Sequence, residues 1–465
     1  MIRLLRYNAL TALILVLLSI LNLSACSSSS NKTLTLEEKL EKIPDITFTR
    51  IRPPQGYKEA FEIYVTQPVD HNRPDGAKFS QRILLSHIDE KAPMVKFHSG
   101  YSTGRNWICE PARLLNANQI YITHRYFDSA RPDPLDWKYL DIWQASSDHH
   151  RIKELFKGIY KGKWVATGYS KGGMTTFYDA RFFPDDADVT IAYVAPMMFG
   201  VEDPRFATFL TEQVGTPEDR EKITAFQRLC LSNRDLLIPC YIDYAQQKGL
   251  TYSFSPGETF EYNVLEYMFS FWQYGDGDTG RIPGADAGPE AWFNHLKEIN
   301  DPANYTEYVM NQFAPFYYQA YTQLGYAPYI YNHLADLLVD LPNPTYRVFA
   351  PADAVMVFDP AAMIDINTWL QNSGNNIIYI YGGNDPYTST AVELTGKTNA
   401  LKIIQPGANH GVNIADLDEK DLVINTLREW LNMNISVTRE QWLQMEETNK
   451  MLIQEERRLR FPRLK

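Results

Sequence analysis

The sequence predicts an α/β fold with a mostly parallel sheet of eight strands and an inserted, mainly helical cap domain. Short runs rich in β-branched and aromatic residues alternate with helix-length segments, as parallel crossovers require. The alternation stops between Pro196 and about Arg347, where aromatic residues recur at irregular or helical spacing. It resumes near residue 376, so we interpret the intervening stretch as a cap inserted between the sixth and seventh strands.

Eight runs have the composition of strands. The first two are too close together for a helix between them, so we expect an antiparallel pair. Helix-length segments separate the later runs, which we expect to pair in parallel. The predicted strands are 61–66, 81–87, 93–98, 118–124, 163–169, 189–195, 376–382 and 400–405.

The same pattern divides the chain into six segments. With 45% hydrophobic and 13% aromatic residues, the chain can bury a large core. We expect a lipoprotein signal peptide (1–25), a tether (26–45), the first part of the α/β core (46–196), the cap (197–347), the second part of the core (348–436) and a helical tail (437–465).

The first residues predict export. Two arginines precede an apolar run, 9–21, which is too short to span a bilayer but suits a signal peptide. The segment 23–26 (LSAC) resembles a bacterial lipobox, which implies cleavage before Cys26 and lipidation of that residue. Several acyl chains give a lasting anchor. We expect an exported bacterial lipoprotein anchored to a membrane, periplasmic or at the cell surface; an ordinary signal peptide with a coincidental cysteine is the alternative.

Charge and cysteine usage narrow the function classes. The formal net charge of −11 makes nucleic acid a poor partner. No cysteine and histidine cluster has the spacing of a structural zinc site, and we expect neither a metal nor a cofactor. Export permits a disulfide, and among Cys109, Cys230 and Cys240 the close pair Cys230–Cys240 is the preferred bridge, although three pairings are open.

Residues 168–172 (GYSKG) fit the pattern G-x-S-x-G. This pattern places a serine on a sharp strand-to-helix turn, with glycines where the two backbones converge. The residues before Ser170 are strand-like, and those after it can form a helix. The motif narrows the prediction to the α/β-hydrolase fold with Ser170 as nucleophile, and the backbone N–H of Lys171 would point into an oxyanion hole.

A second segment, 100–104 (GYSTG), fits the same pattern, so position along the fold must decide. Only three strands would precede Ser102, and the strand that supplies the oxyanion loop would be missing. With Ser170 as nucleophile, 93–98 becomes the third strand, and the loop after it supplies the second oxyanion donor. We expect this donor to be the Tyr101 N–H.

The acid and the base should follow the nucleophile in the order Asp or Glu, then His. Asp385 comes just after the seventh predicted strand, and His410 just after the eighth. Asp385 would orient His410, which would take the proton from Ser170. A turn-forming aspartate and a surface histidine are the plain alternatives. Asp353 and Asp359 are rival acids, but both precede the seventh strand.

Further segments carry a family resemblance: 67–71 (QPVDH), 124–127 (HRYF), 129–132 (SARP), 136–137 (DW), 148–152 (DHHRI), 168–175 (GYSKGGMT) and 269–274 (FSFWQY). Through them most of the chain after about residue 45 resembles the secreted prolyl tri- and tetrapeptidyl aminopeptidases, distant relatives of lysosomal Pro-X carboxypeptidase. The resemblance implies cleavage after a proline near a free peptide N-terminus, with the same three catalytic residues. The lipobox departs from these freely secreted relatives.

Such an exopeptidase must bind a protonated amine and a proline ring, which carboxylates and aromatic faces suit. The cap offers Glu258, Glu261 and Glu266, with Glu266 preferred, although a solvated helix face explains them equally well. The leading hypothesis is a serine exopeptidase that releases tri- and tetrapeptides by cleavage after proline, through an acyl-enzyme on Ser170. The alternatives are an esterase or lipase on the same fold and a non-catalytic surface-binding lipoprotein.

Overall fold

The computed structural model describes residues 34–447 and 449. The expected signal peptide, Cys26 and residues 450–465 of the expected tail lie outside the described residues. The described residues divide into two compact units, the first ending at Pro44 and the second beginning at Asp45. The described part of the first unit contains helix α2 (Leu36–Leu40), which begins at a capping box formed by Thr35 and Glu38. No helix within 34–447 and 449 has the length and apolar character needed to cross a membrane.

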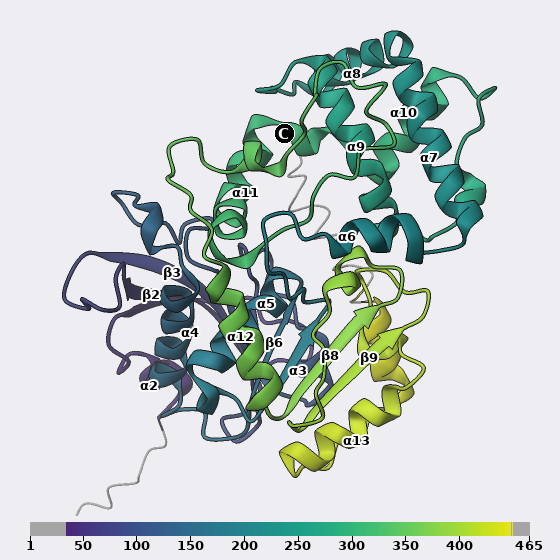
Figure 1. Cartoon of the computed structure of the whole chain (residues 1–465). Coiled ribbons are helices and arrows are strands. Elements are labelled where there is room, and N and C mark those ends of the chain that lie inside the picture. Colours follow the sequence, from purple (N-terminus) through teal and green to yellow (C-terminus); the bar gives the residue numbers. More distant parts are fainter. Residues whose placement is uncertain (1–33, 448, 450–465) are drawn as a thin grey trace, which may run out of the picture. The chain divides into compact units, whose positions relative to one another are not determined.

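A nine-stranded sheet in the second unit has the order β1-β2-β3-β5-β4-β6-β7-β8-β9 (Figure 1). The first three strands pair antiparallel, as do β3 and β5, and all further pairs are parallel. The strands are β1 (Ile46–Ile51), β2 (Glu59–Pro68), β3 (Lys78–His87), β4 (Met94–His98), β5 (Asn118–Ile122), β6 (Trp164–Tyr169), β7 (Val189–Tyr193), β8 (Ile377–Gly382) and β9 (Ala400–Gln405).

This sheet confirms the α/β-hydrolase fold and the antiparallel pairing of the first two predicted strands. The predicted number of eight strands is wrong by one, because β1 precedes them. β1 lies at the sheet edge with a single partner, and none of its residues is fully buried. An edge strand without a buried face lacks the hydrophobic signal that reveals the other eight.

Helices cover both faces of the sheet. The helices α4 (Ile142–Phe156), α5 (Lys171–Phe182) and α12 (Pro360–Asn372) pack on one face (Figure 1). Their buried residues belong to one apolar cluster. On the other face α3 (Glu110–Leu114) and α13 (Lys420–Leu431) belong to a second cluster. Alternate residues of β7 enter the two clusters, Ala192 the first and Ile191 the second. Burial on both faces explains why the central strands read as continuous apolar runs.

The cap lies between β7 and β8 in the chain. Its helices are α6 (Arg205–Thr208), α7 (Pro217–Ser232), α8 (Arg234–Lys248), α9 (Pro256–Tyr274), α10 (Pro289–Ile299) and α11 (Glu307–Gln319). Thr216 and Ser255 cap α7 and α9, and each helix has proline at its first position. α9 is buried along most of its length and packs against α7, α8 and α10. The aromatic run that suggested the cap is therefore its central helix.

Short helical turns complete the fold. The 3₁₀ turns are η1 (Trp137–Tyr139), η2 (Pro184–Asp186), η4 (Thr279–Arg281), η5 (Pro302–Tyr305), η7 (Tyr346–Phe349), η8 (Pro386–Thr390) and η9 (Ile414–Asp416). Two π-helical turns, η3 (Phe209–Gln213) and η6 (Ala320–Leu324), directly follow α6 and α11. In the described part of the predicted tail, residues 439–447 and 449 are helical.

The predicted Cys230–Cys240 bridge is wrong, because Cys109, Cys230 and Cys240 are all free thiols. Asn233 ends α7 and begins α8, so the two cysteines of the expected bridge stand on different helices. Cys230 is buried in the large apolar cluster that also contains the buried residues of α4, α5 and α12. Cys240 is half-buried, and its Sγ lies 3.6 Å from the carbonyl oxygen of Leu236 in its own helix.

Arg125 and Asp148 form a fully buried ion pair beneath the loops of the core. Two guanidinium nitrogens of Arg125 lie 2.7 and 2.8 Å from the two carboxylate oxygens of Asp148. Arg125 also donates to the carbonyls of Val69 and Tyr139, and His71 Nε2 lies 2.7 Å from Asp148 Oδ1. Three segments that carry the family resemblance thus meet in one structural network.

A buried carboxylate also fixes the loop after β9. Glu110, in α3, accepts hydrogen bonds from the Tyr193 hydroxyl at 3.0 Å and from the backbone N–H groups of Ile414 and Ala415 at 2.8 and 2.9 Å. Burial raises the pKa of the Glu110 carboxyl to about 7. One side chain therefore connects α3, β7 and η9, the turn that follows His410.

We expect Glu110→Gln to reduce the pH dependence of stability. A carboxyl whose pKa is raised by folding binds its proton more tightly in the folded state. Its contribution therefore favours the folded state at low pH and is lost as the pH rises from about 4.5 to about 7. Urea unfolding at several pH values across this window measures the free energy of unfolding. In the variant, the free energy of unfolding should fall less steeply with pH than in the wild type. Glu221→Gln, at an exposed position of α7, is the matched control and should keep the wild-type slope.

Candidate active site

Ser170 stands at the turn between β6 and α5. Its φ of 54° and ψ of −122° belong to a conformation that residues with a Cβ rarely adopt. The backbone N–H of Ser170 donates to the carbonyl of Tyr193 in β7 at 2.9 Å. A strained serine between a strand and a helix is the geometry of a nucleophile elbow, in which the hydroxyl projects above the sheet.

Close backbone contacts explain the glycines around this serine. A Cβ atom on Gly168 would lie within 3.0 Å of the Gly172 backbone, and one on Gly172 would lie equally close to the carbonyl of His98. A Cβ on Gly100 would collide with Gly172 in the same way. The loop after β4 therefore rests directly on the first turn of α5.

Asp385 and His410 meet through a direct hydrogen bond. Asp385 follows β8 and caps η8 by accepting the Tyr387 N–H at 3.1 Å. Its other carboxylate oxygen lies 2.6 Å from His410 Nδ1, and both side chains are buried. Because an ionised carboxylate only accepts, Nδ1 carries the proton in this contact and Nε2 is left as an acceptor. The His410 N–H donates to the carbonyl of Gln273 at 3.0 Å.

The structure relates Ser170 to His410 through shared neighbours. Gln273 and Tyr387 line a cavity of about 90 Å³ together with Ser170. The same two residues contact His410, since the Tyr387 ring centre lies 5.0 Å from that of the imidazole. His410 Nε2 is buried and has no hydrogen-bond partner among the described residues. A serine–histidine bond often tightens only when substrate binds.

The two expected oxyanion donors differ in their present contacts. Lys171 is the first residue of α5, where a backbone N–H has no acceptor within the helix. The Tyr101 N–H instead donates to Ser99 Oγ at 3.1 Å, and this hydroxyl donates to the Tyr101 carbonyl at 2.6 Å. Ser99 thus occupies the Tyr101 donor in this structure.

The alternative nucleophile Ser102 and the alternative acids Asp353 and Asp359 lie in different structural contexts. Ser102 lies in the irregular loop after β4 and not at a strand-to-helix turn. Asp353 accepts from Trp137 Nε1 at 3.3 Å, and Asp359 caps α12 by accepting the Ala361 N–H at 3.0 Å. These contacts give each rival acid a structural role away from the loop of His410.

Of the three candidate acids in the cap, Glu266 lines the cavity. It projects from α9, and the Tyr346 hydroxyl donates to its Oε2. The Ser270 hydroxyl, one turn further along α9, lies 3.4 Å from Oε1. The carboxylate is therefore held in place at the wall that it shares with Ser170.

The other two acids have structural roles. Glu261 is fully buried, pairs with Arg234 at 2.7 Å and accepts the backbone N–H groups of residues 339–341. Glu258 closes the capping box of α9 with Ser255. Neither belongs to the lining of the cavity.

Aromatic and amide side chains form most of the cavity wall. The sequence predicted Ser170, Tyr101, Glu266 and an aromatic cap, but not most of the other lining residues, because these come from segments that lie far apart in the chain. The FSFWQY segment pointed to Gln273; Asn300 and Asn304 had no signal in the sequence. The remaining lining residues are Tyr101, Ser270, Tyr305, Val309, Met310, Phe313, Phe316, Tyr317, Tyr326, Tyr329, Tyr346 and Phe349.

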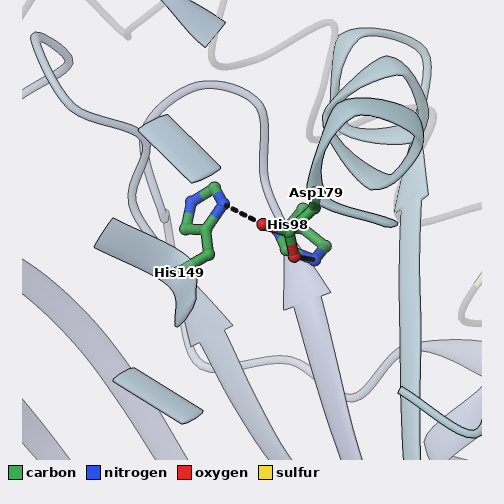
Figure 2. A group of neighbouring side chains, drawn as sticks. All are labelled: His98, His149 and Asp179. Atoms are coloured by element: carbon green, nitrogen blue, oxygen red, sulfur yellow. Dashed lines mark ion pairs between the residues drawn. The ribbon is translucent and has the colours of Figure 1, made fainter. Parts of the chain in front are cut away.

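A separate buried cluster lies where β4, α4 and α5 meet. Figure 2 shows the two imidazoles of His98 and His149 directed at the Asp179 carboxylate, at 3.3 and 3.8 Å. Within the described residues these three side chains are the set that could hold a metal ion. The Lys96 ammonium, however, lies 2.6 Å from Asp179 Oδ2 and already neutralises the carboxylate. A cation would have to displace this lysine, so we assign no metal to the cluster.

Comparisons by sequence identify relatives. The family described as PS-10 peptidase S37 matches residues 29–441. The prolyl tri/tetrapeptidyl aminopeptidase of Streptomyces mobaraensis is 37% identical over 407 residues, which cover 85% of this chain and 84% of that protein.

Solved structures resemble the chain only weakly. Acetyl xylan esterase 1 from Thermoanaerobacterium sp. JW/SL YS485 is 11% identical with a TM-score of 0.34, over 85% of this chain and 92% of that protein. Proline iminopeptidase from Mycobacterium smegmatis is 12% identical with a TM-score of 0.34, over 85% and 98%. Likeness at this level adds nothing about function. The sequence matches are decisive: the chain belongs to the peptidase S37 family and is a serine peptidase.

Proposed function

We propose that this protein is a serine exopeptidase that releases tri- and tetrapeptides from peptide N-termini by cleavage after proline, with Ser170, His410 and Asp385 as its catalytic triad. One observation carries the proposal: a single cavity is lined by the elbow serine, by the carboxylate of Glu266 and by many aromatic rings. The name of the Streptomyces relative, a prolyl tri/tetrapeptidyl aminopeptidase, supports the same specificity.

The geometry supports acyl transfer in two steps. His410 Nε2 takes the proton of Ser170 as Oγ attacks the carbonyl carbon of the substrate proline, and Asp385 holds the imidazole through Nδ1. The Lys171 and Tyr101 N–H groups stabilise the oxyanion, the latter after leaving Ser99. The C–N bond then breaks as His410 returns the proton to the leaving amine. Water, activated by the same imidazole, hydrolyses the ester on Ser170.

Glu266 and the aromatic rings supply the selectivity in this proposal. A carboxylate at a cavity wall pairs with a protonated amine far better than with a neutral amide. The rings offer flat apolar faces for proline; those of Tyr329 and Tyr346 stack with their centres 3.8 Å apart. Because residues of both the core and the cap line this cavity, it should accept a short, unfolded peptide end more readily than a folded protein.

A fluorophosphonate probe should label Ser170, because the probe reacts with an activated serine. Ser170→Ala should lose labelling, and its kcat should fall by several orders of magnitude. Ser102→Ala is the matched control from the rival motif and should keep both. A probe adduct that mass spectrometry maps to Ser102 contradicts the assignment.

Glu266→Gln should abolish discrimination between free and blocked peptide N-termini. We expect the wild type to cleave peptides with proline at position three or four and to lose most kcat/KM when the amine is acetylated. The variant should lose roughly a hundredfold in kcat/KM for the free amine, because the ammonium loses its charged partner. Glu258→Gln is the matched control, since glutamine also completes a capping box.

The same peptide series separates the alternatives. Cleavage that ignores proline, or rapid hydrolysis of long-chain esters without peptide cleavage, would favour an esterase. Absence of all turnover in correctly folded protein would favour a binding lipoprotein. An equal free-to-acetylated ratio in the wild type would remove Glu266 from amine recognition.

The proposal also places the enzyme at a bacterial membrane, periplasmic or at the cell surface, through lipidated Cys26. Cys26 lies outside the described residues, so the lipobox pattern in the sequence is the support for this part of the proposal. Cys26→Ala should move the protein from the membrane fraction to the soluble fraction or leave it unprocessed, because the acylated residue is missing. Immunoblots of fractionated cells measure this. An unchanged membrane fraction would show that the anchor is elsewhere.

A further inference from the structure

Lys171 follows Ser170, yet its side chain points into the protein. Only 1% of its surface is exposed. Its Nζ donates to the carbonyl of Gly100 at 2.6 Å and lies 5.1 Å from the ring centre of Phe127 and 5.6 Å from that of Tyr101. A long basic side chain thus reaches from the first turn of α5 to the loop after β4.

This amine lacks the partner that buried lysines normally have. Lys96, the other fully buried lysine of the same region, pairs with Asp179 and Asp186. None of the ion pairs between described residues includes Lys171, and burial lowers its pKa well below the usual value. An unpaired buried amine is costly to keep. The hydrogen bond from Nζ to the Gly100 carbonyl is therefore the polar contact that compensates for burying this amine.

The Gly100 carbonyl belongs to the same peptide unit as the Tyr101 N–H. A trans peptide is planar, so its C=O and N–H point in opposite directions, and a bond to one sets the direction of the other. Gly100 has a φ of +72° and, without a Cβ, has access to both halves of backbone space. The glycine alone does not prevent this peptide from rotating. The bond from Lys171 to the Gly100 carbonyl opposes this rotation, in addition to the bond from the Tyr101 N–H to Ser99 Oγ.

We propose that Lys171 is a positioning residue that holds the Gly100–Tyr101 peptide in the orientation needed for the oxyanion hole. The inference rests on the proposed function above. In the free protein Ser99 Oγ accepts the Tyr101 N–H. When the tetrahedral intermediate forms, its oxyanion replaces this hydroxyl, while Lys171 keeps the peptide from turning its carbonyl toward the negative charge.

Lys171→Met tests the proposal, because methionine keeps an unbranched buried side chain but cannot donate to Gly100. One oxyanion donor contributes about a hundredfold to a thousandfold in kcat. Since rotation leaves the correct orientation partly populated, we expect kcat to fall about tenfold to a hundredfold, with KM changed by less than about threefold. A peptide aldehyde ending in prolinal forms a tetrahedral adduct, and its affinity should fall in parallel with kcat. A product peptide ending in proline should bind as tightly as to the wild type.

Controls separate positioning from general damage. Thr176→Val removes a buried hydrogen bond to the Gly173 carbonyl within the same helix, and should leave kcat and aldehyde affinity within about twofold. Thermal unfolding and circular dichroism verify the fold of each variant. If Lys171→Met does not fold, Lys171→Gln serves in its place. The glutamine side chain is polar, like that of lysine, but is one bond shorter and should not reach the Gly100 carbonyl. We again expect a lower kcat with little change in KM.

Two results would overturn the inference. The first is unchanged aldehyde affinity and kcat in a folded Lys171 variant. The second is an equal loss of aldehyde and product-peptide binding, which would mean that the lysine maintains the whole cavity. Absence of turnover in the wild type would overturn the proposed function together with this inference, whereas normal wild-type turnover with either of these results overturns the inference alone.

Discussion

The active-site geometry depends on one constraint, the close approach of three backbone segments around Ser170. The end of β6, the first turn of α5 and the loop after β4 touch at Gly168, Gly172 and Gly100, where no Cβ fits. This packing maintains the strained φ of Ser170, which would otherwise relax at a gain of a few kcal/mol. It also brings the proposed nucleophile close to the loop and the helix turn that would supply the two oxyanion donors.

Buried charges hold the surrounding loops to the same face of the sheet. Arg125 and Asp148 join the end of β2 and the loop after β5 to α4, with every hydrogen-bonding group of the pair engaged by neighbours. Lys96 joins β4 to α5 through Asp179. Breaking such a pair leaves a charge buried alone, which costs several kcal/mol. The charged residues in the segments that carry the family resemblance therefore have a structural role in holding the core together.

Helix α9 connects the proposed amine-binding residue to the loop of the proposed base. Glu266 and Gln273 are seven residues apart, so they lie on the same face of the helix, two turns from one another. Glu266 lines the cavity, and the Gln273 carbonyl accepts the His410 N–H. The cap is therefore bonded directly to the loop that carries the proposed base. A displacement of α9 would alter amine recognition and histidine orientation together.

The sequence by itself determined the features that are local or periodic. Strand-like runs, the glycine pattern around Ser170 and the order of Asp385 and His410 sufficed to predict the fold and which residues should meet. Tertiary packing alone decided the rest. The sequence does not distinguish Glu258, Glu261 and Glu266. In the structure Glu258 lies in the first turn of α9, whereas Glu261 faces the half-buried Arg234 and Glu266 faces the cavity. Three further features depend on contacts between distant segments: the edge strand β1, the separated thiols of Cys230 and Cys240, and the bond from Lys171 to Gly100. Such contacts do not produce a periodic pattern in the sequence.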